Sequence, residues 1–190
     1  MTFSADAVIE EVRQAFPARR QGRFLPLVNS TQGDEPLRVI AAFDDKDDWT
    51  TLAPEWLDKV PSGLGSALSF LADEALRFYI PAYVVADMVS TLRMVDPAFA
   101  LTNGFDRRSR NERGSPHGEQ TRADRARVRW SGLTKEQALA IVHYLEWRVQ
   151  RDRRDHGHIA DNSIVEALKT YWYDRAAKSA DIGRTAQEIR

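Results

Sequence analysis

The stretch DHGHIAD places two histidines and two aspartates within seven residues, a combination that could bind a metal ion. The metal-ligand candidates are His156, His158 and Asp161. Imidazole and carboxylate groups bind divalent metals, and histidines two residues apart occur in some hydrolytic metal sites. A metal site, however, needs three or four ligands that converge from elements fixed by a core, whereas these three share one apparent turn between helices. We therefore interpret the stretch as a polar turn without a metal, and a metal-dependent hydrolase is kept as an alternative function.

Arginine gathers in the segment 104–129, where it outnumbers the four acidic residues. The candidates for contact with a partner are Arg107, Arg108, Arg110, Arg113, Arg122, Arg125, Arg127 and Arg129. Clustered guanidinium groups bind phosphates, which makes nucleic acid one suitable ligand. The segment lacks interleaved aromatic residues for stacking on bases, and acidic residues of the N-terminal half offer complementary charge within the chain itself. We predict a solvated surface whose charge suits another protein, and nucleic acid binding is a further alternative.

No motif of known chemistry accompanies these residues. The chain has no cysteine, which excludes a disulfide framework, a thiolate zinc site and a cysteine nucleophile. It also contains no G-x-S-x-G elbow, no Walker-type phosphate loop and no dinucleotide-binding glycine pattern. The aspartates of the stretch DDKDD lie in a bend, without the apolar pocket that shifts a catalytic pKa. We therefore predict no catalytic residue and no cofactor, and the residues alone leave open whether the chain is an enzyme.

Length and charge set further bounds. A chain of 190 residues suffices for one hydrophobic core and is short for two, so we expect a single domain over residues 1–190. With a formal net charge of −1, the molecule as a whole has no electrostatic reason to bind DNA or anionic lipid. Acidic residues stand where a signal peptide would be basic, and no uncharged apolar run approaches the roughly 20 residues that span a bilayer. We predict a cytoplasmic protein that does not enter a membrane.

Apolar residues recur at helical spacing through most of the chain, which predicts a mainly α fold of several helices. Ser4 is a suitable N-cap for the first helix. Thr134 and Gln137 have the pattern of a capping box at the start of a long helix, and Ser163 with Glu166 has the same pattern at the last main helix.

Three segments are less regular. Residues 37–43 form a short apolar run that fits a helix or a buried strand, and we favour a helix because Pro36 suits an early helical position. The segment 104–129 has almost no large apolar groups and cannot bury enough surface to offset its ordering entropy, which predicts a long flexible loop. The polar tail from about 178 to 190 is expected to be frayed.

The densest apolar stretch, SFLADEALRFYIPAYVVADM, contains Pro81 near its middle. Proline has no N–H, and its ring disfavours helical geometry at the preceding residue, so a helix running through this point would cost about 3 kcal/mol. The stretch therefore predicts two helices that meet at a corner just before the proline. The residues of this structural corner are Phe78, Tyr79, Pro81 and Tyr83. Buried tyrosines usually hydrogen-bond through their hydroxyl groups, so both are expected to bind a neighbouring backbone.

Four segments, VIEEVRQAF, AFDDKDDWTTL, LSFLADEALRFYIPAY and GLTKEQALAIVHYLEW, together resemble an uncharacterised bacterial family of small domains of unknown function. The shared features are an aromatic residue in the first helix, a tryptophan after an acidic bend, the proline corner and a late capped helix. The resemblance spans Val8 to Trp172, apart from the arginine-rich segment, which is longer and more basic than such a family leads one to expect. It implies a compact helical fold and no activity, so it brings no catalytic residues.

The distribution of charge favours an interaction protein. Acidic residues accumulate in the N-terminal half and arginines in the segment 104–129, and opposed charges of this kind steer a protein partner. Since no recognisable chemistry accompanies them, we expect a non-catalytic, cytosolic protein-interaction module, of an accessory or immunity-like kind.

Overall fold

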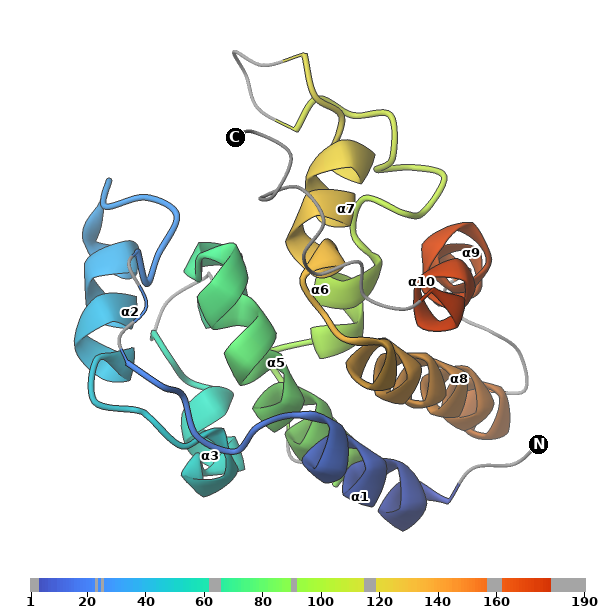
Figure 1. The fold of residues 1–190 in the computed structure, drawn as a ribbon, viewed down its shortest axis with the longest axis horizontal. Coiled ribbons are helices and arrows are strands. Elements are labelled where there is room, and N and C mark those ends of the chain that lie inside the picture. Colours follow the sequence, from blue (N-terminus) through green and yellow to red (C-terminus); the bar gives the residue numbers. More distant parts are fainter. Residues whose placement is uncertain are drawn as a thin grey trace, which may run out of the picture.

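Helices make up most of the chain, as the apolar spacing predicts (Figure 1). The computed structural model describes residues 4–22, 24, 26–61, 66–89, 92–114, 119–156 and 162–178. The helices are α1 (Ala5–Ala15), α2 (Asp34–Phe43), α3 (Pro54–Leu57), α4 (Ala67–Phe70), α5 (Asp73–Met88), α6 (Pro97–Thr102), α7 (Arg122–Ser131), α8 (Lys135–His156), α9 (Ser163–Ala167) and α10 (Tyr173–Ala177). A short 3₁₀ turn η1 (Trp49–Thr51) precedes α3, and a π-helical segment η2 (Leu168–Trp172) joins α9 to α10. The described residues form one compact domain with no strand beyond isolated β-bridges.

Helix α5 lies at the centre of the domain and packs against α1, α3, α6 and α7 (Figure 1). Its buried residues run from Ala75 to Met88 and lie on all sides of the helix. A helix that is apolar all round is one surrounded by other elements. Helix α5 is therefore the central helix of the domain. Two of the helices that pack against it, α6 and α7, form the site described below.

Pro81 lies inside α5, so the predicted break before Pro81 is wrong. The chain turns earlier, at Leu71 and Ala72, which have extended backbone between α4 and α5. Proline leaves the carbonyl one turn earlier without its helical donor, which costs about 3 kcal/mol. Ile80 and Tyr83 beside it are completely buried, and burial of one large side chain stabilises by roughly 1.5–3 kcal/mol, so packing on both sides offsets the local cost.

The aromatic residues of the predicted corner pack around Tyr79. Its ring centroid lies 4.9 Å from that of Phe78 and 4.7 Å from that of Phe43. The Tyr79 hydroxyl donates to the backbone carbonyls of Lys46 at 2.5 Å and Phe43 at 3.3 Å, which is the expected tie to a neighbouring backbone. Burial raises the pKa of Tyr79 to about 12, so the hydroxyl remains a donor. The buried hydroxyl of Tyr83 has no hydrogen-bond partner among the described residues, so no such tie is seen there.

Two local signals for helix ends and one prediction of a helical segment are confirmed. The Ser4 hydroxyl caps α1 by accepting a hydrogen bond from the N–H of Ala7. Thr134 and Gln137 form the predicted capping box of α8, in which each side chain accepts from the other residue's N–H, at 3.2 and 2.9 Å. Residues 37–43 belong to α2, so the helical alternative is correct.

The capping box predicted for Ser163 and Glu166 is wrong. Asn162 is the N-cap of α9, and its side chain makes no capping hydrogen bond. The Glu166 carboxylate accepts instead from the backbone N–H of Arg107, at 2.6 Å. This contact joins α9 to the arginine-rich segment, which is distant in sequence.

The segment 104–129 is not one long loop. Turns follow α6, and the chain then forms α7, whose N-terminus carries a capping box of Thr121 and Asp124. The buried side chains of α7 are Ala123, Ala126 and Trp130. The composition of the segment misses two contributions, because Phe105 near its start is buried and α7 continues beyond its end to Trp130, which is completely buried. The tail beyond residue 178 lies outside the described residues.

The carboxyl end of α7 is held by arginines from two other helices. Arg77 of α5 donates to the carbonyl of Arg129, and Arg175 of α10 donates to the carbonyls of Ser131 and Leu133. Cations at this end of a helix satisfy free carbonyls and interact favourably with its dipole. Helix α7 is thus fixed at both ends, which holds its exposed arginines in place.

A buried ion pair ties α5 to α8. Asp87, which is 6% exposed, accepts hydrogen bonds from the Tyr144 hydroxyl at 2.7 Å and the Arg148 guanidinium at 2.5 Å. Arg148 also lies 3.4 Å from the carboxylate of Asp96, and Arg151 lies 3.4 Å from that of Asp87. Burial, together with the Asp87 charge, raises the pKa of Tyr144 well above its ordinary value, so the hydroxyl stays protonated and donates.

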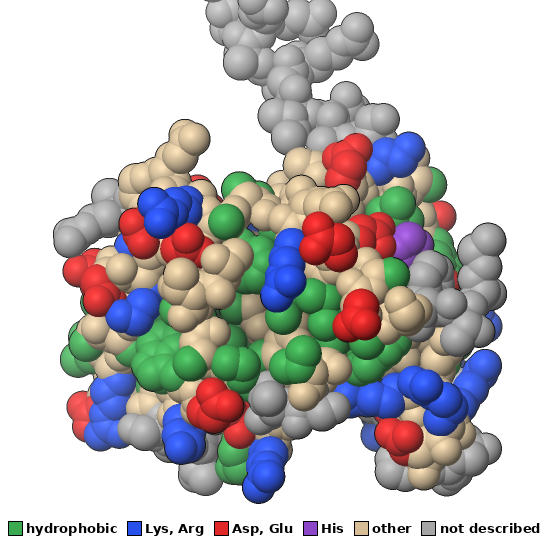
Figure 2. Space-filling view, turned by 90° about the horizontal axis from the view of Figure 1, so that it is seen from below, with side chains coloured by type: hydrophobic (Ala, Val, Ile, Leu, Met, Phe, Trp, Pro, Cys, Tyr) green, Lys and Arg blue, Asp and Glu red, His purple; other side chains and the backbone are tan. Residues whose placement is uncertain are grey.

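Hydrophobic side chains also reach the surface on the face seen from below, where they form a band among charged side chains (Figure 2). Helices α1 and α3 lie on this side of the domain (Figure 1). More than half of an ordinary protein surface is contributed by apolar atoms, so the band by itself indicates no site.

Candidate interaction groove

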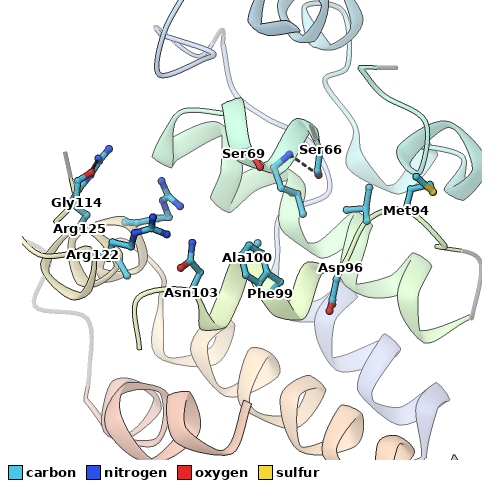
Figure 3. A pocket seen from close by; sticks show the side chains of 14 residues that line it. Ser66, Ser69, Met94, Asp96, Phe99, Ala100, Asn103, Gly114, Arg122 and Arg125 are labelled. Atoms are coloured by element: carbon cyan, nitrogen blue, oxygen red, sulfur yellow. Dashed lines mark hydrogen bonds between the residues drawn. The ribbon is translucent and has the colours of Figure 1, made fainter. Parts of the chain in front are cut away.

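An open groove of about 520 Å³ lies between α4, α6 and α7. Arg122 and Arg125 lie at one end, Met94 lies at the other, and Phe99 lies between them (Figure 3). Ser69 of α4 lines the opposite side. The groove therefore has a basic end, built from the predicted partner-binding arginines, and an apolar end.

The basic end is held by contacts on both sides of α7. Arg122 pairs with Glu112 at 2.9 Å, and their side chains are 45% and 51% exposed. Arg125 donates to the carbonyl of Gly114, and Arg129 pairs with an aspartate of α5 at 2.9 Å. An exposed ion pair contributes at most about 1 kcal/mol, so Arg122 can exchange Glu112 for another carboxylate at little cost.

The apolar end consists of side chains that a folded domain usually buries. Met94 is 79% exposed and Phe99 is 64% exposed. Single exposed apolar side chains are common, but two large ones lining the same groove form a surface suited to contact with another molecule.

Two aspartates fix the backbone that carries these apolar side chains. Asp58 accepts hydrogen bonds from the N–H groups of residues 93–95, at 3.0, 2.7 and 3.2 Å. Partial burial acts to raise the pKa of Asp58, but these hydrogen bonds outweigh it and hold the pKa below its ordinary value. Asp96 caps α6 by accepting from the N–H of Ala98 at 2.9 Å, which sets the first turn and the position of Phe99.

The turn that follows α6 depends on Gly104. Its φ is +97°, and an added Cβ would lie 2.8 Å from the carbonyl oxygen of Arg122, so only glycine allows α7 to approach this closely. Asp106 accepts from the N–H groups of Arg108 and Ser109, at 2.9 and 3.0 Å. Burial opposes ionisation of Asp106, but these hydrogen bonds and that of the Ser109 hydroxyl hold its pKa below the ordinary value.

The predicted arginines divide into two groups. Only Arg122, Arg125 and Arg129 line the groove. The side chains of the four turn arginines are exposed and make no ion pair within the described part of the chain; these are Arg107, Arg108, Arg110 and Arg113. Arg127 is also exposed and lies 3.7 Å from Asp124.

The candidate metal ligands lie mostly outside the described residues. His156 is the last residue of α8, but its side chain falls outside, as do His158 and Asp161. Where the chain is described, no three histidine or acidic side chains lie close enough to hold a metal ion. His143 contacts the Glu11 carboxylate at 2.6 Å across the packing of α1 on α8. The metal-dependent hydrolase stays an untested alternative.

Comparison with known proteins identifies a family for this chain. A family model described as a family of unknown function (DUF6714) matches residues 5–176. The chain belongs to the DUF6714 family. Membership of an uncharacterised family is thereby confirmed, and bacterial origin stays a prediction. No curated protein and no solved structure matches this DUF6714 chain. No helix within the described ranges is long and apolar enough to cross a membrane.

Sequence reasoning missed the apolar end of this DUF6714 groove. Asp96 followed by Pro97 signals the start of a helix, and that signal is present in the chain. Nothing in the spacing, however, distinguishes Phe99 on this short helix from Leu101, which is completely buried. Met94 lies outside any helix, where no periodic pattern applies.

Proposed function

We propose that this DUF6714 protein is a non-catalytic, cytosolic protein-interaction module that binds an acidic partner protein. One observation carries the proposal: seven of the eight predicted arginines are exposed, and five of them, Arg107, Arg108, Arg110, Arg113 and Arg125, make no ion pair within the described residues. Exposed charge of one sign raises the rate of encounter with an opposite surface and selects against partners of like charge. An accessory or immunity-like role suits this chemistry, because such a protein acts by covering a partner.

Nucleic acid is the second candidate, because the same exposed arginines would neutralise phosphates. Two carboxylates lie among the arginines and would repel a phosphate chain: that of Asp106 accepts from backbone N–H groups of the turn, and that of Glu112 pairs with Arg122. The carboxylates of a partner protein are separate groups, so they can pair with the arginines without lying close to Asp106 or Glu112. A protein partner is therefore favoured over nucleic acid.

The test begins with the full chain, tagged in its native cells. Proteins that co-purify are identified by mass spectrometry, and the complex is then reconstituted from purified components. We expect a complex of defined mass in size-exclusion chromatography with light scattering, and a Kd that rises with salt. A chain that remains a monomer and forms no complex with any purified candidate would contradict the proposal.

A pair of triple variants localises the binding. The test variant is Arg107→Gln/Arg108→Gln/Arg113→Gln, and the matched control, with the same change in net charge on other exposed positions, is Arg13→Gln/Lys135→Gln/Arg154→Gln. The test variant should weaken binding by about tenfold or more, because each exposed charge contributes up to about 1 kcal/mol. Equal weakening by both variants would show attraction by net charge alone. Tighter binding to a single-stranded oligonucleotide than to the protein would favour nucleic acid.

A further inference from the structure

The two ends of the groove between α4, α6 and α7 call for different chemistry in one occupant. Phe99 and Met94 offer apolar surface, whereas Arg122 and Arg125 offer guanidinium groups at the opposite end (Figure 3). Side chains of α4 close one side, and those of α6 close the other. An occupant that satisfies both ends must carry an apolar group and an acidic group at separate points along its length.

The electrostatics of the groove favour an acidic occupant. Among its described lining residues, three arginines face one acidic residue, Asp96. The Asp96 carboxylate is already engaged, because it accepts from the N–H of Ala98 and lies 3.4 Å from Arg148. Arg122 can exchange its exposed partner Glu112 for a carboxylate of the occupant, since that pair is weak.

The apolar end argues against nucleic acid as the occupant. Sequence-tolerant binding of single strands uses aromatic rings that stack on successive bases, whereas Phe99 is the only aromatic side chain among the described lining residues. Met94 is a flexible aliphatic side chain of the kind found on protein-binding surfaces. The Asp73 and Glu112 carboxylates beside the groove arginines would repel a continuous phosphate backbone.

We infer that this groove binds a segment of a partner protein that carries one large apolar side chain and, further along its length, a group of acidic residues. The apolar side chain packs on Phe99 and Met94, and the carboxylates pair with Arg122 and Arg125. This inference rests on the proposed function and specifies the chemistry of the partner. Exposed Phe99 supplies the anchor contact, and the arginines set orientation and rate of association.

Labelled synthetic peptides test the inference by fluorescence anisotropy with the full chain. The probe contains one tryptophan, a Gly-Ser spacer and three aspartates, and it is made in both orders. One control peptide replaces the tryptophan with alanine, and the other replaces the aspartates with asparagines. The protein variants are Phe99→Ala and Arg122→Gln, with Leu37→Ala as matched control, because Leu37 is 51% exposed on α2 and does not line the groove.

We expect the wild-type chain to bind one order of the probe about tenfold more tightly than either control peptide. In Phe99→Ala, the probe and the alanine peptide should bind with equal affinity, while the probe should still bind more tightly than the asparagine peptide. In Arg122→Gln, the probe and the asparagine peptide should bind with equal affinity, while the probe should still bind more tightly than the alanine peptide. Leu37→Ala should leave both differences in affinity unchanged. Melting curves by circular dichroism check that each variant is folded, and Met94→Ala provides a second apolar variant.

Three results would overturn the inference: equal affinity for the tryptophan and alanine peptides, equal effects of Phe99→Ala and Leu37→Ala, or tighter, Phe99-independent binding of an oligonucleotide. The proposed function is judged separately. Suppose that a reconstituted partner binds the Phe99→Ala chain normally but binds the Arg107→Gln/Arg108→Gln/Arg113→Gln chain more weakly. That result would support the proposed function and contradict the inference about the groove. The expected peptide pattern without any reconstituted partner supports the groove and counts against the function.

Discussion

Replacement of Asp87 by asparagine tests whether the buried ion pair between α5 and α8 contributes to stability. The side chain of Asp87 is 8% exposed and that of Arg148 is 12% exposed, so Asp87→Asn leaves a guanidinium with little access to water. Breaking such a pair by removing one charge costs about 3–5 kcal/mol. Asp96 remains 3.4 Å from Arg148 and supplies part of the lost charge, so we expect about 3 kcal/mol, the lower end of that range.

Urea unfolding at neutral pH, followed by tryptophan fluorescence, measures this loss in the free energy of unfolding. For a domain of this size, 1 kcal/mol corresponds to about 2–4 °C in Tm, so the melting temperature should fall by about 6–12 °C. The control Glu112→Gln removes one partner of an exposed pair and should cost less than about 1 kcal/mol.

A double variant separates the lost charge from lost packing. Asp87→Asn/Arg148→Met removes the unpaired cation as well, and should be less destabilised than Asp87→Asn alone. A loss below about 1 kcal/mol for Asp87→Asn, or a double variant less stable than the single one, would refute this account of the buried pair.

Three further predictions concern single residues. Gly104→Ala should lower the free energy of unfolding by about 2 kcal/mol or more, because the added Cβ would clash with α7 and the backbone has a positive φ. Gly22→Ala should cost only about 1 kcal/mol, because its φ is also positive, at +84°, but the space around it is open. Urea titrations of the two variants test this difference. Because the pKa of Asp58 lies below its ordinary 3.8 in the folded chain, its stabilisation is complete above that pH and is lost as pH falls through the folded-state pKa. Asp58→Asn should therefore lose less stability between pH 6 and pH 3 than the wild-type chain, and equal losses would contradict the assignment. Tyr79→Phe should cost about 1–2 kcal/mol in thermal unfolding, because the carbonyl of Lys46 loses its donor, and an unchanged Tm would show that this hydrogen bond contributes nothing net.

The helix boundaries that sequence reasoning predicted correctly are those set by neighbouring residues. The hydroxyl groups of Ser4 and Thr134 reach N–H groups only three residues away, so their patterns can be read without knowledge of the fold. Pro81 shows the opposite case, because its local penalty is offset by packing against helices distant in sequence. The segment 104–129 was misjudged by its average composition, although the capping pattern of Thr121 and its neighbours was present.

The candidate groove could be predicted only in part. Its arginines could be predicted from the sequence, because a charged residue type by itself indicates an exposed side chain. Its apolar end required the fold, since exposure of Met94 and Phe99 depends on α6 and on a turn that Asp58 holds from another part of the chain. Sequence can therefore indicate the sign of the charge on a binding surface, whereas its shape comes from contacts between distant segments.

Arg148 has a consequence for how the groove responds to an occupant. It contacts both the interior carboxylate of Asp87 and the capping carboxylate of Asp96, so the first turn of α6 is coupled to the centre of the domain. Removal of the Arg148 guanidinium would take away one of the contacts that hold the Asp96 carboxylate at the start of α6, the helix that carries Phe99. Substitutions at Arg148 should therefore change the affinity of the apolar end for its occupant, although Arg148 does not line the groove.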